Sequence, residues 1–203
     1  MRIVWLNGKL VPEDEARISP FDRGLLLGDG VFETMRAYDG RCYRQEEHLA
    51  RLRAGCARMR LAFPEGLAEA IRDVLRANGL SEAAVRVTLT RGPGGRGASP
   101  RGAGPPTALV TAVPVPPVPA RVNVVTAPFP HTGVTGVKTV DYVANVLARI
   151  AAEEAGADDA IFVDGDGFVV EATQANVFAF LGHALVTPPL SSGCLPGVTR
   201  SDV

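Results

Sequence analysis

The pattern of apolar and polar residues in the first half of the chain predicts short strands and two helices. Apolar residues recur at helical spacing over residues 45–60 and 64–78. They alternate strictly with polar residues over 84–90, which is typical of a half-buried strand. Alternation and turn signals together predict strands over residues 2–6, 9–12, 31–37, 41–44, 84–90 and 107–113, with a glycine-rich loop between the first two pairs.

The second half begins after a stiff connector and predicts strands grouped around one helix. Residues 114–119 alternate proline with valine, which favours an extended linker. Helical spacing returns between about 140 and 155, and Gly197 opens a last helical turn. Strands are expected over residues 121–126, 160–163, 168–171 and 176–181, the last three as an antiparallel meander.

These elements predict an α+β fold with largely antiparallel sheets. We expect a small α+β domain over residues 1–113, a Pro-rich connector over 114–120 and part of a second domain over 121–203. The last helix holds only about one turn, too little to bury an apolar stripe by itself. We therefore expect the second domain to be truncated at its C-terminus, or to be completed by something else.

Composition narrows the classes of function. The 203 residues carry a formal net charge of −1, so no global charge attracts nucleic acid or an anionic membrane. No apolar run reaches the roughly 18 residues that span a bilayer and no signal-type stretch follows Met1, so we expect a cytoplasmic protein. The three cysteines lack close pairing, and His48, His131 and His183 lack ligand spacing, so we expect reduced structural thiols and no metal site.

The use of lysine singles out Lys138. Of the 21 basic residues, only Lys9 and Lys138 are lysine, and the others are arginine. Lys9 follows a hairpin turn and is expected on the surface, whereas Val137 and Val140 flank Lys138. Guanidinium never gives up its proton, but a lysine in an apolar setting has a lowered pKa and becomes an amine nucleophile. An exposed surface charge is the alternative interpretation of Lys138.

An amine that forms an imine with pyridoxal phosphate needs further groups, and the sequence offers a candidate for each. A carboxylate must keep the pyridine nitrogen protonated, while an arginine and a helix N-terminus are the usual phosphate donors. Glu171 ends an apolar strand, and Arg51 lies on a predicted helix. Val198 and Thr199 open the last helix.

Six ordered motifs then indicate a family. They are DRGLLLGDGVFET at 22–34, EHLARL at 47–52, GVK at 136–138, DDAIFVD at 158–164, EATQANVF at 171–178, and TPPL at 187–190 with LPGVTR at 195–200. With these motifs the chain resembles the class IV, or fold-type IV, pyridoxal-phosphate enzymes, which include branched-chain and D-amino-acid aminotransferases and aminodeoxychorismate lyase. The resemblance implies a small α+β domain, a larger barrel-like domain, pyridoxal 5'-phosphate between them and a homodimer.

The resemblance also implies a role for each candidate residue. Lys138 would be the Schiff-base lysine and proton shuttle, and Glu171 the partner of the pyridine nitrogen. Arg51 would bind the phosphate together with the backbone of Val198 and Thr199 and the Thr199 hydroxyl. Tyr142 would lie near the phenolic oxygen of the cofactor. The residues implied on the substrate side are Phe32, Arg91 and Arg96.

Two reactions share these cofactor residues, so the substrate side must separate them. Residues 28–34 and the loop at 91–97 look closer to 4-amino-4-deoxychorismate lyase, which releases pyruvate and 4-aminobenzoate. Tyr142 and the motifs at 187–190 and 195–199 look closer to aminotransferases. We expect an aminotransferase that moves the amino group of an amino acid, of the branched-chain type, to a 2-oxo acid. The lyase is the alternative, and a non-catalytic remnant that keeps the dimer surface is the third hypothesis.

Overall fold

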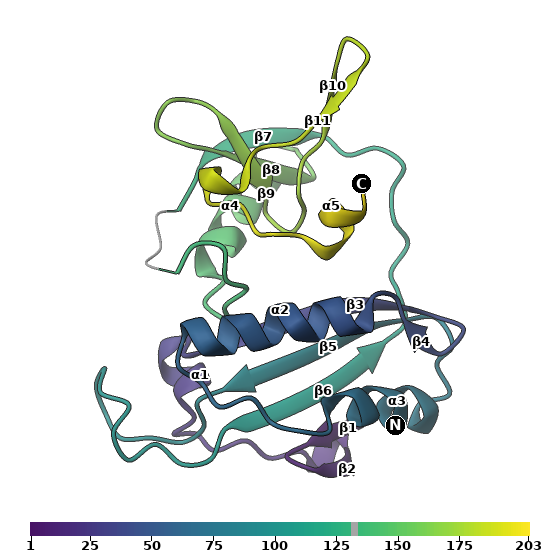
Figure 1. Ribbon diagram of the computed structural model, residues 1–203, viewed down its shortest axis with the longest axis vertical. Coiled ribbons are helices and arrows are strands. Elements are labelled where there is room, and N and C mark those ends of the chain that lie inside the picture. Colours follow the sequence, from purple (N-terminus) through teal and green to yellow (C-terminus); the bar gives the residue numbers. More distant parts are fainter. Residues whose placement is uncertain (131–133) are drawn as a thin grey trace. The chain divides into compact units, whose positions relative to one another are not determined.

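The computed structural model describes residues 1–130 and 134–203, which form two compact units (Figure 1). The first unit comprises Met1–Pro117 and Lys138–Asp141, and the second comprises Val118–Val137 and Tyr142–Val203. The change of unit after Pro117 lies inside the predicted connector. No sequence signal predicted that Lys138–Asp141 returns to the first unit. His131, one of the histidines considered above, lies outside the described residues.

A six-stranded antiparallel sheet forms the centre of the first unit, in the order β2-β1-β6-β5-β3-β4 (Figure 1). Both predicted hairpins are confirmed, and Asn7 and Asp39 take the positive φ angles that their tight turns require. The strands are β1 (Ile3–Leu6), β2 (Lys9–Pro12), β3 (Gly30–Tyr38), β4 (Arg41–Cys42), β5 (Ala83–Thr90) and β6 (Thr107–Val113).

Helices α2 (Gln45–Arg58) and α3 (Leu67–Ala77) pack on this sheet, as the helical spacing predicts. Met35, Val85 and Ala112 lie opposite one another across β3, β5 and β6 and are almost fully buried. Helix α2 contacts β3, and α3 contacts β6 and β1. Burial of this apolar surface is the main favourable contribution to the stability of the first unit. The helices add Leu52, Cys56, Ile71 and Val74 to the same core.

The predicted glycine-rich loop before β3 contains a short helix instead, α1 (Arg23–Leu27). The Asp22 carboxylate caps it by accepting the Gly24 N–H at 2.8 Å, and Gly28 ends it in the left-handed conformation. Asp22 is buried and also accepts the hydroxyls of Thr90 and Thr107. Five residues are too few for a helical period to show, so the hydrophobic pattern could not predict α1.

The second unit holds a three-stranded sheet in the order β7-β8-β9 and a separate hairpin. Strand β7 (Val124–Pro128) runs parallel to β8 (Asp159–Val163), and helix α4 (Val143–Glu154) lies between them in sequence. Strand β9 (Val169–Ala172) returns antiparallel to β8. The small core of this unit consists of Ala148, Ala152, Ala160, Phe162, Val170 and Cys194.

The predicted meander is therefore only partly correct. Strands β8 and β9 form its first hairpin, but β10 (Ala179–Leu181) pairs with β11 (Ala184–Val186) rather than with β9. The parallel pair is also a departure from the expected antiparallel sheets. A helical crossover such as α4 allows the next strand to run in the same direction, and alternation of residues carries no information about direction.

Three short helical segments complete the fold. They are η1 (Glu13–Glu15), η2 (Leu190–Ser192) and α5 (Val198–Asp202), and Gly197 is the N-cap residue of α5, as predicted. Within the described residues, every helix is too short or too polar to cross a bilayer. The same residues hold no cluster of three His, Cys, Asp or Glu side chains suited to a metal ion.

Candidate active site

Lys138 is held against strand β3 by backbone contacts. Strand β4 pairs only with Ala37 and Tyr38, at the end of β3, so the start of β3 is open on that side. There the Phe32 N–H donates to the Lys138 carbonyl at 2.9 Å, and the Val140 N–H donates to the Gly30 carbonyl at 3.0 Å. A short antiparallel bridge between Val31 and Thr139 lies between these two bonds. The main chain of Lys138 is therefore fixed relative to the sheet.

Gly30 explains why the segment fits so closely. A Cβ atom at Gly30 would lie 2.6 Å from the Leu89 carbonyl oxygen and 3.2 Å from a methyl group of Val140. Only glycine lets β3 approach both neighbours at this point. The glycine of the GDGVF motif thus has a structural role in seating the Lys138 segment.

The Lys138 side chain lies over an aromatic ring. Its Nζ is 4.6 Å from the centroid of the Phe32 ring, and the Arg86 Cζ is 3.7 Å from the same centroid. Phe32 is 4% exposed, and Lys138 is half-buried. The ring attracts a cation and removes water from around the amine at the same time. Lys138 is therefore partly shielded from water in the structure.

Arg51 lies on α2 and binds a buried carboxylate of β3. Its Nε donates to Glu33 Oε1 at 2.6 Å, and its Nη2 donates to Glu33 Oε2 at 2.8 Å. His48 Nδ1 lies 2.8 Å from the same Oε2. Burial by itself raises the pKa of Glu33, but the hydrogen bonds from His48 and Arg51 and their charges bring the pKa below its ordinary value. Sequence reasoning missed Glu33, although it lies inside the first motif.

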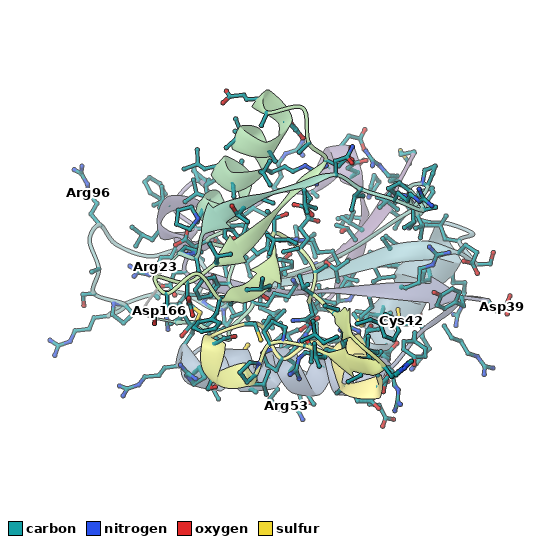
Figure 2. All side chains as sticks on the ribbon, turned by 90° about the horizontal axis from the view of Figure 1, so that it is seen from above. Arg23, Asp39, Cys42, Arg53, Arg96 and Asp166 are labelled. Carbon is teal, nitrogen blue, oxygen red and sulfur yellow. The ribbon has the colours of Figure 1, made fainter. Side chains whose placement is uncertain are left out.

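Arg91 and Arg96 have different surroundings, although both lie in the predicted substrate loop. Arg91 donates to both oxygens of Asp29, at 2.7 and 2.9 Å, and to the carbonyls of Met59 and Arg60. Arg96 is exposed, and Figure 2 shows it at the outer edge of the loop, pointing away from the sheet. Arg91 thus ties the loop to the end of α2, whereas Arg96 is open to solvent.

In the second unit, Glu171 and Tyr142 are each held by backbone groups. Glu171 lies in β9, is half-buried, and its Oε2 accepts the Leu195 N–H at 2.9 Å. The Tyr142 hydroxyl donates to the Thr173 carbonyl at 3.2 Å. The same carbonyl accepts the Asn145 amide at 2.7 Å. These bonds join the start of α4 to the segment that follows Glu171.

Val198 and Thr199 lie in the first turn of α5, which is anchored next to Glu171. Val198 is buried, whereas Thr199 is exposed. The Asn176 amide donates to the Leu195 carbonyl at 2.9 Å. A Cβ at Gly197 would lie 1.9 Å from Asn176 Oδ1, so a side chain at position 197 would displace the Asn176 amide. The N-cap residue of α5 is Gly197, which has no side chain to cap the first turn. The N–H groups in the first turn of a helix have no acceptor within the helix itself.

The structure thus groups the predicted residues within each unit. In the first unit it brings Lys138 next to Phe32 and pairs Arg51 with Glu33. In the second it links Glu171, through Leu195, to the segment that leads to Val198 and Thr199. Arg86 and Glu33 are additional residues that the sequence analysis did not select. Glu33 is a buried charge, which is rare unless the charge has a partner, whereas Arg86 occupies a polar position of its alternating strand and gave no such signal.

Comparisons with known proteins agree on one family. The family model described as amino-transferase class IV matches residues 30–203. A protein of Methanocaldococcus jannaschii that carries the name of a branched-chain-amino-acid aminotransferase is 39% identical over 209 residues, covering 98% of this chain and 73% of its own length. These matches cover almost all of the chain.

Solved structures extend the similarity to the fold. A branched-chain amino acid aminotransferase of T.th., complexed with N-(5'-phosphopyridoxyl)-L-glutamate, superposes with a TM-score of 0.90 and 30% identity, covering 99% of this chain and 71% of that one. A Legionella pneumophila protein named as a 4-amino-4-deoxychorismate lyase gives a TM-score of 0.86 and 26% identity over 94% of this chain and 74% of its own.

Proposed function

Because the chain belongs to the class IV aminotransferase family, whose cofactor is pyridoxal 5'-phosphate, we propose that it transfers the amino group of a branched-chain amino acid to a 2-oxo acid. The family and its cofactor were expected from the six motifs, and both are confirmed. The substrate is the proposed part. It is supported by the names of similar proteins and by the apolar Phe32 ring beside Lys138.

The residues present fit this cofactor. Lys138 offers an amine over an apolar ring, and the Leu195 N–H stabilises the charged carboxylate of Glu171. Arg51 and the first turn of α5 offer donors of the kinds that bind phosphate. We propose Lys138 as the covalent attachment point, Glu171 as the partner of the pyridine nitrogen, and Arg51, Val198 and Thr199 as phosphate ligands.

The observation that carries the proposal is the placement of Lys138. When bound, pyridoxal 5'-phosphate supplies an electron sink for the α-carbon of the substrate. Lys138 Nζ would take the α-proton from the amino acid and deliver a proton to the cofactor carbon that receives the amino group, which is general acid–base catalysis. Glu171 would hold the ring nitrogen of the cofactor in its protonated form. Two backbone hydrogen bonds hold the Lys138 segment on β3, so the side chain of Lys138 can move while its main chain stays in place.

Borohydride trapping tests the attachment point. We expect the purified protein to carry a yellow chromophore that borohydride fixes to the peptide containing Lys138. The substitution Lys138→Ala abolishes trapping, whereas Lys9→Ala, at the only other lysine of the chain, leaves it unchanged. A colourless protein that cannot be trapped contradicts the proposal and supports the non-catalytic remnant.

The reaction itself is tested with two sets of substrates. Formation of glutamate from branched-chain amino acids and 2-oxoglutarate supports the aminotransferase. Formation of pyruvate and 4-aminobenzoate from aminodeoxychorismate supports the lyase, which the similarity to the Legionella protein keeps as the second candidate. In that reaction Arg91 or Arg96 would meet a substrate carboxylate. The geometry favours Arg96, because the Arg91 guanidinium is already bound to Asp29 and also to the carbonyls of Met59 and Arg60.

A homodimer is proposed together with this function. Phe21, Leu25, Leu26 and Leu27 are between 49% and 72% exposed, so a group of large apolar side chains lies on the surface around α1. Such groups are typical of surfaces that bind another chain. Light scattering is expected to give twice the mass of the chain, and Leu25→Asp to give the monomer. A monomer in both samples contradicts the dimer. The cytoplasmic location stays a prediction.

A further inference from the structure

Arg51 is held by a carboxylate that lies almost completely out of water. The side chain of Glu33 is 1% exposed, and that of Arg51 is 16% exposed. The two groups form a bidentate pair, with Nε on Oε1 at 2.6 Å and Nη2 on Oε2 at 2.8 Å. Bidentate pairs between arginine and carboxylate fix the plane and the rotation of the guanidinium as well as its distance. Glu33 therefore determines which way the remaining N–H groups of Arg51 point.

His48 keeps the carboxylate itself in place. It precedes Arg51 by three residues, so α2 presents both side chains on the same side of the helix. Its Nδ1 lies 2.8 Å from Oε2 of Glu33. With these partners Glu33 is ionised at neutral pH, because its pKa is below its ordinary value. One buried charge on β3 thus organises two side chains of α2.

We infer that Glu33 is a positioning residue for phosphate recognition, acting through the Arg51 guanidinium. This inference rests on the proposed role of Arg51 as a phosphate ligand. Guanidinium has five N–H donors, and Glu33 accepts two of them along one edge. The remaining donors are then aimed in a fixed direction before any ligand arrives. Preorganised donors bind an anion more tightly than a mobile arginine, because less side-chain freedom is lost on binding.

Whether phosphate affinity rises or falls when Glu33 is replaced distinguishes a positioning role from a purely electrostatic one. As a negative charge, Glu33 opposes the binding of an anionic phosphate, so its neutralisation would increase the affinity. As a positioning residue, Glu33 promotes binding, so its neutralisation decreases the affinity. The variant Glu33→Gln removes the charge and breaks the bidentate pairing. The variant Glu33→Asp keeps the charge but withdraws the carboxylate by one methylene, so it changes position alone.

The test compares the dissociation constants of pyridoxal 5'-phosphate and of pyridoxal, which lacks the phosphate, on the purified full chain. The measured quantity is the ratio of the two constants. We expect both Glu33→Gln and Glu33→Asp to reduce the preference for the phosphorylated form about tenfold, which corresponds to the loss of one charge-assisted hydrogen bond. The matched control is Glu82→Gln, which breaks the exposed pair of Glu82 with Arg36 and leaves the ratio unchanged.

A double variant shows whether Glu33 acts through Arg51. In the Arg51→Gln background, Glu33→Gln is expected to have no further effect on the ratio. If Glu33→Asp leaves the preference for pyridoxal 5'-phosphate over pyridoxal unchanged, or increases it, the inference is wrong. It is also wrong if Glu33→Gln reduces this preference as much in the Arg51→Gln background as it does in the wild type. If Glu33→Gln does not fold, as judged by near-UV circular dichroism, the ratio in Glu33→Asp decides. If the wild-type protein binds neither compound, the proposed function fails first, which is a distinguishable result.

Phosphorus NMR gives a readout that does not depend on activity. With the phosphorylated cofactor bound, a fixed Arg51 holds the phosphate as a dianion, so its resonance is expected to stay constant between about pH 6 and 8. In Glu33→Asp the resonance is expected to titrate in this range, because the phosphate group ordinarily has a pKa of about 6. A non-titrating resonance in the variant contradicts positioning through Glu33.

Discussion

Arg23 Nε donates to an Asp29 carboxylate oxygen at 2.9 Å, although the Arg23 side chain is only 4% exposed. The rest of this guanidinium binds the three consecutive carbonyls of Gly97, Ala98 and Ser99, at 3.0 to 3.1 Å. Arg91 binds the same Asp29 from the other end of the loop. One buried arginine of α1 therefore binds the glycine-rich segment after β5. Arg96 lies in this segment, directly before the three carbonyls that Arg23 binds.

Removal of this anchor is expected to free the loop. The substitution Arg23→Met leaves three carbonyls and part of Asp29 without their donor, which we expect to lower the free energy of unfolding by about 3 kcal/mol. In addition, trypsin is expected to cut after Arg96 and Arg101 much faster than in the wild type, in conditions where both proteins are folded. Peptide mapping by mass spectrometry measures the cleavage.

The matched control for this prediction is Arg17→Met. Arg17 is an exposed arginine that donates to carbonyls of its own segment, those of Asp14 and Ala16. We expect its replacement to leave cleavage at Arg96 unchanged. Equal cleavage rates in Arg23→Met and wild type would show that Arg23 does not hold the loop.

The stability of the protein is expected to fall at acid pH through two carboxylates. Burial raises the pKa values of Asp29 and Glu33, but their arginine and histidine partners lower them more, so both lie below the ordinary 3.8 and 4.5. As the pH falls, these two carboxylates take up protons in the unfolded chain at a higher pH than in the folded protein. The stabilisation that they provide is therefore complete above pH 4.5 and is lost as the pH falls through their lowered pKa values. Urea unfolding between about pH 7 and 3 measures this loss. The variant Asp29→Asn is expected to lose less stability over this range, and an unchanged loss contradicts the assignment.

The close approach at Gly30 makes a third prediction. In Gly30→Ala the new Cβ meets the backbone of Leu89, which cannot rotate away, so we expect a loss of about 1 to 3 kcal/mol in unfolding free energy. The Lys138 segment is also pushed off β3, so borohydride trapping is expected to decrease. Gly95→Ala is the control, since its Cβ meets nothing within 4 Å and the residue has no positive φ. Equal stability of the two variants would contradict the tight packing at Gly30.

The thiols of the first unit are expected to react slowly. Burial raises the pKa values of Cys42 and Cys56 from 9.0 to about 11. Because the thiolate is the nucleophile, the reactive fraction at about pH 8 falls roughly a hundredfold. Iodoacetamide labelling, followed by mass spectrometry, is expected to accelerate with each pH unit up to about 11, and to become fast in urea at any of these pH values. Rapid labelling of folded protein at about pH 8 would contradict the burial of these thiols.

The local sequence pattern predicted some helices and strands and missed others. The alternation over residues 84–90 predicted β5, and the helical spacing after residue 45 predicted α2, because these periods belong to the backbone itself. The motif order predicted the family and the cofactor. By contrast, α1 is too short to show a helical period. The residues of β7 and β8 gave no indication that the two strands pair in parallel. The return of Lys138–Asp141 to the first unit also had no signal in the sequence.

The amino-acid sequence alone determined which chemistry was available: one lysine among arginines in an apolar setting, and a carboxylate and an arginine in the order of a known family. Only the tertiary structure decided what these groups meet. Arg51 pairs with Glu33 across 18 positions and Arg91 with Asp29 across 62, and Lys138 joins β3 from more than a hundred residues away. Periodicity and propensity act over a few residues, whereas the partner of a buried charge depends on which distant segments the core brings together.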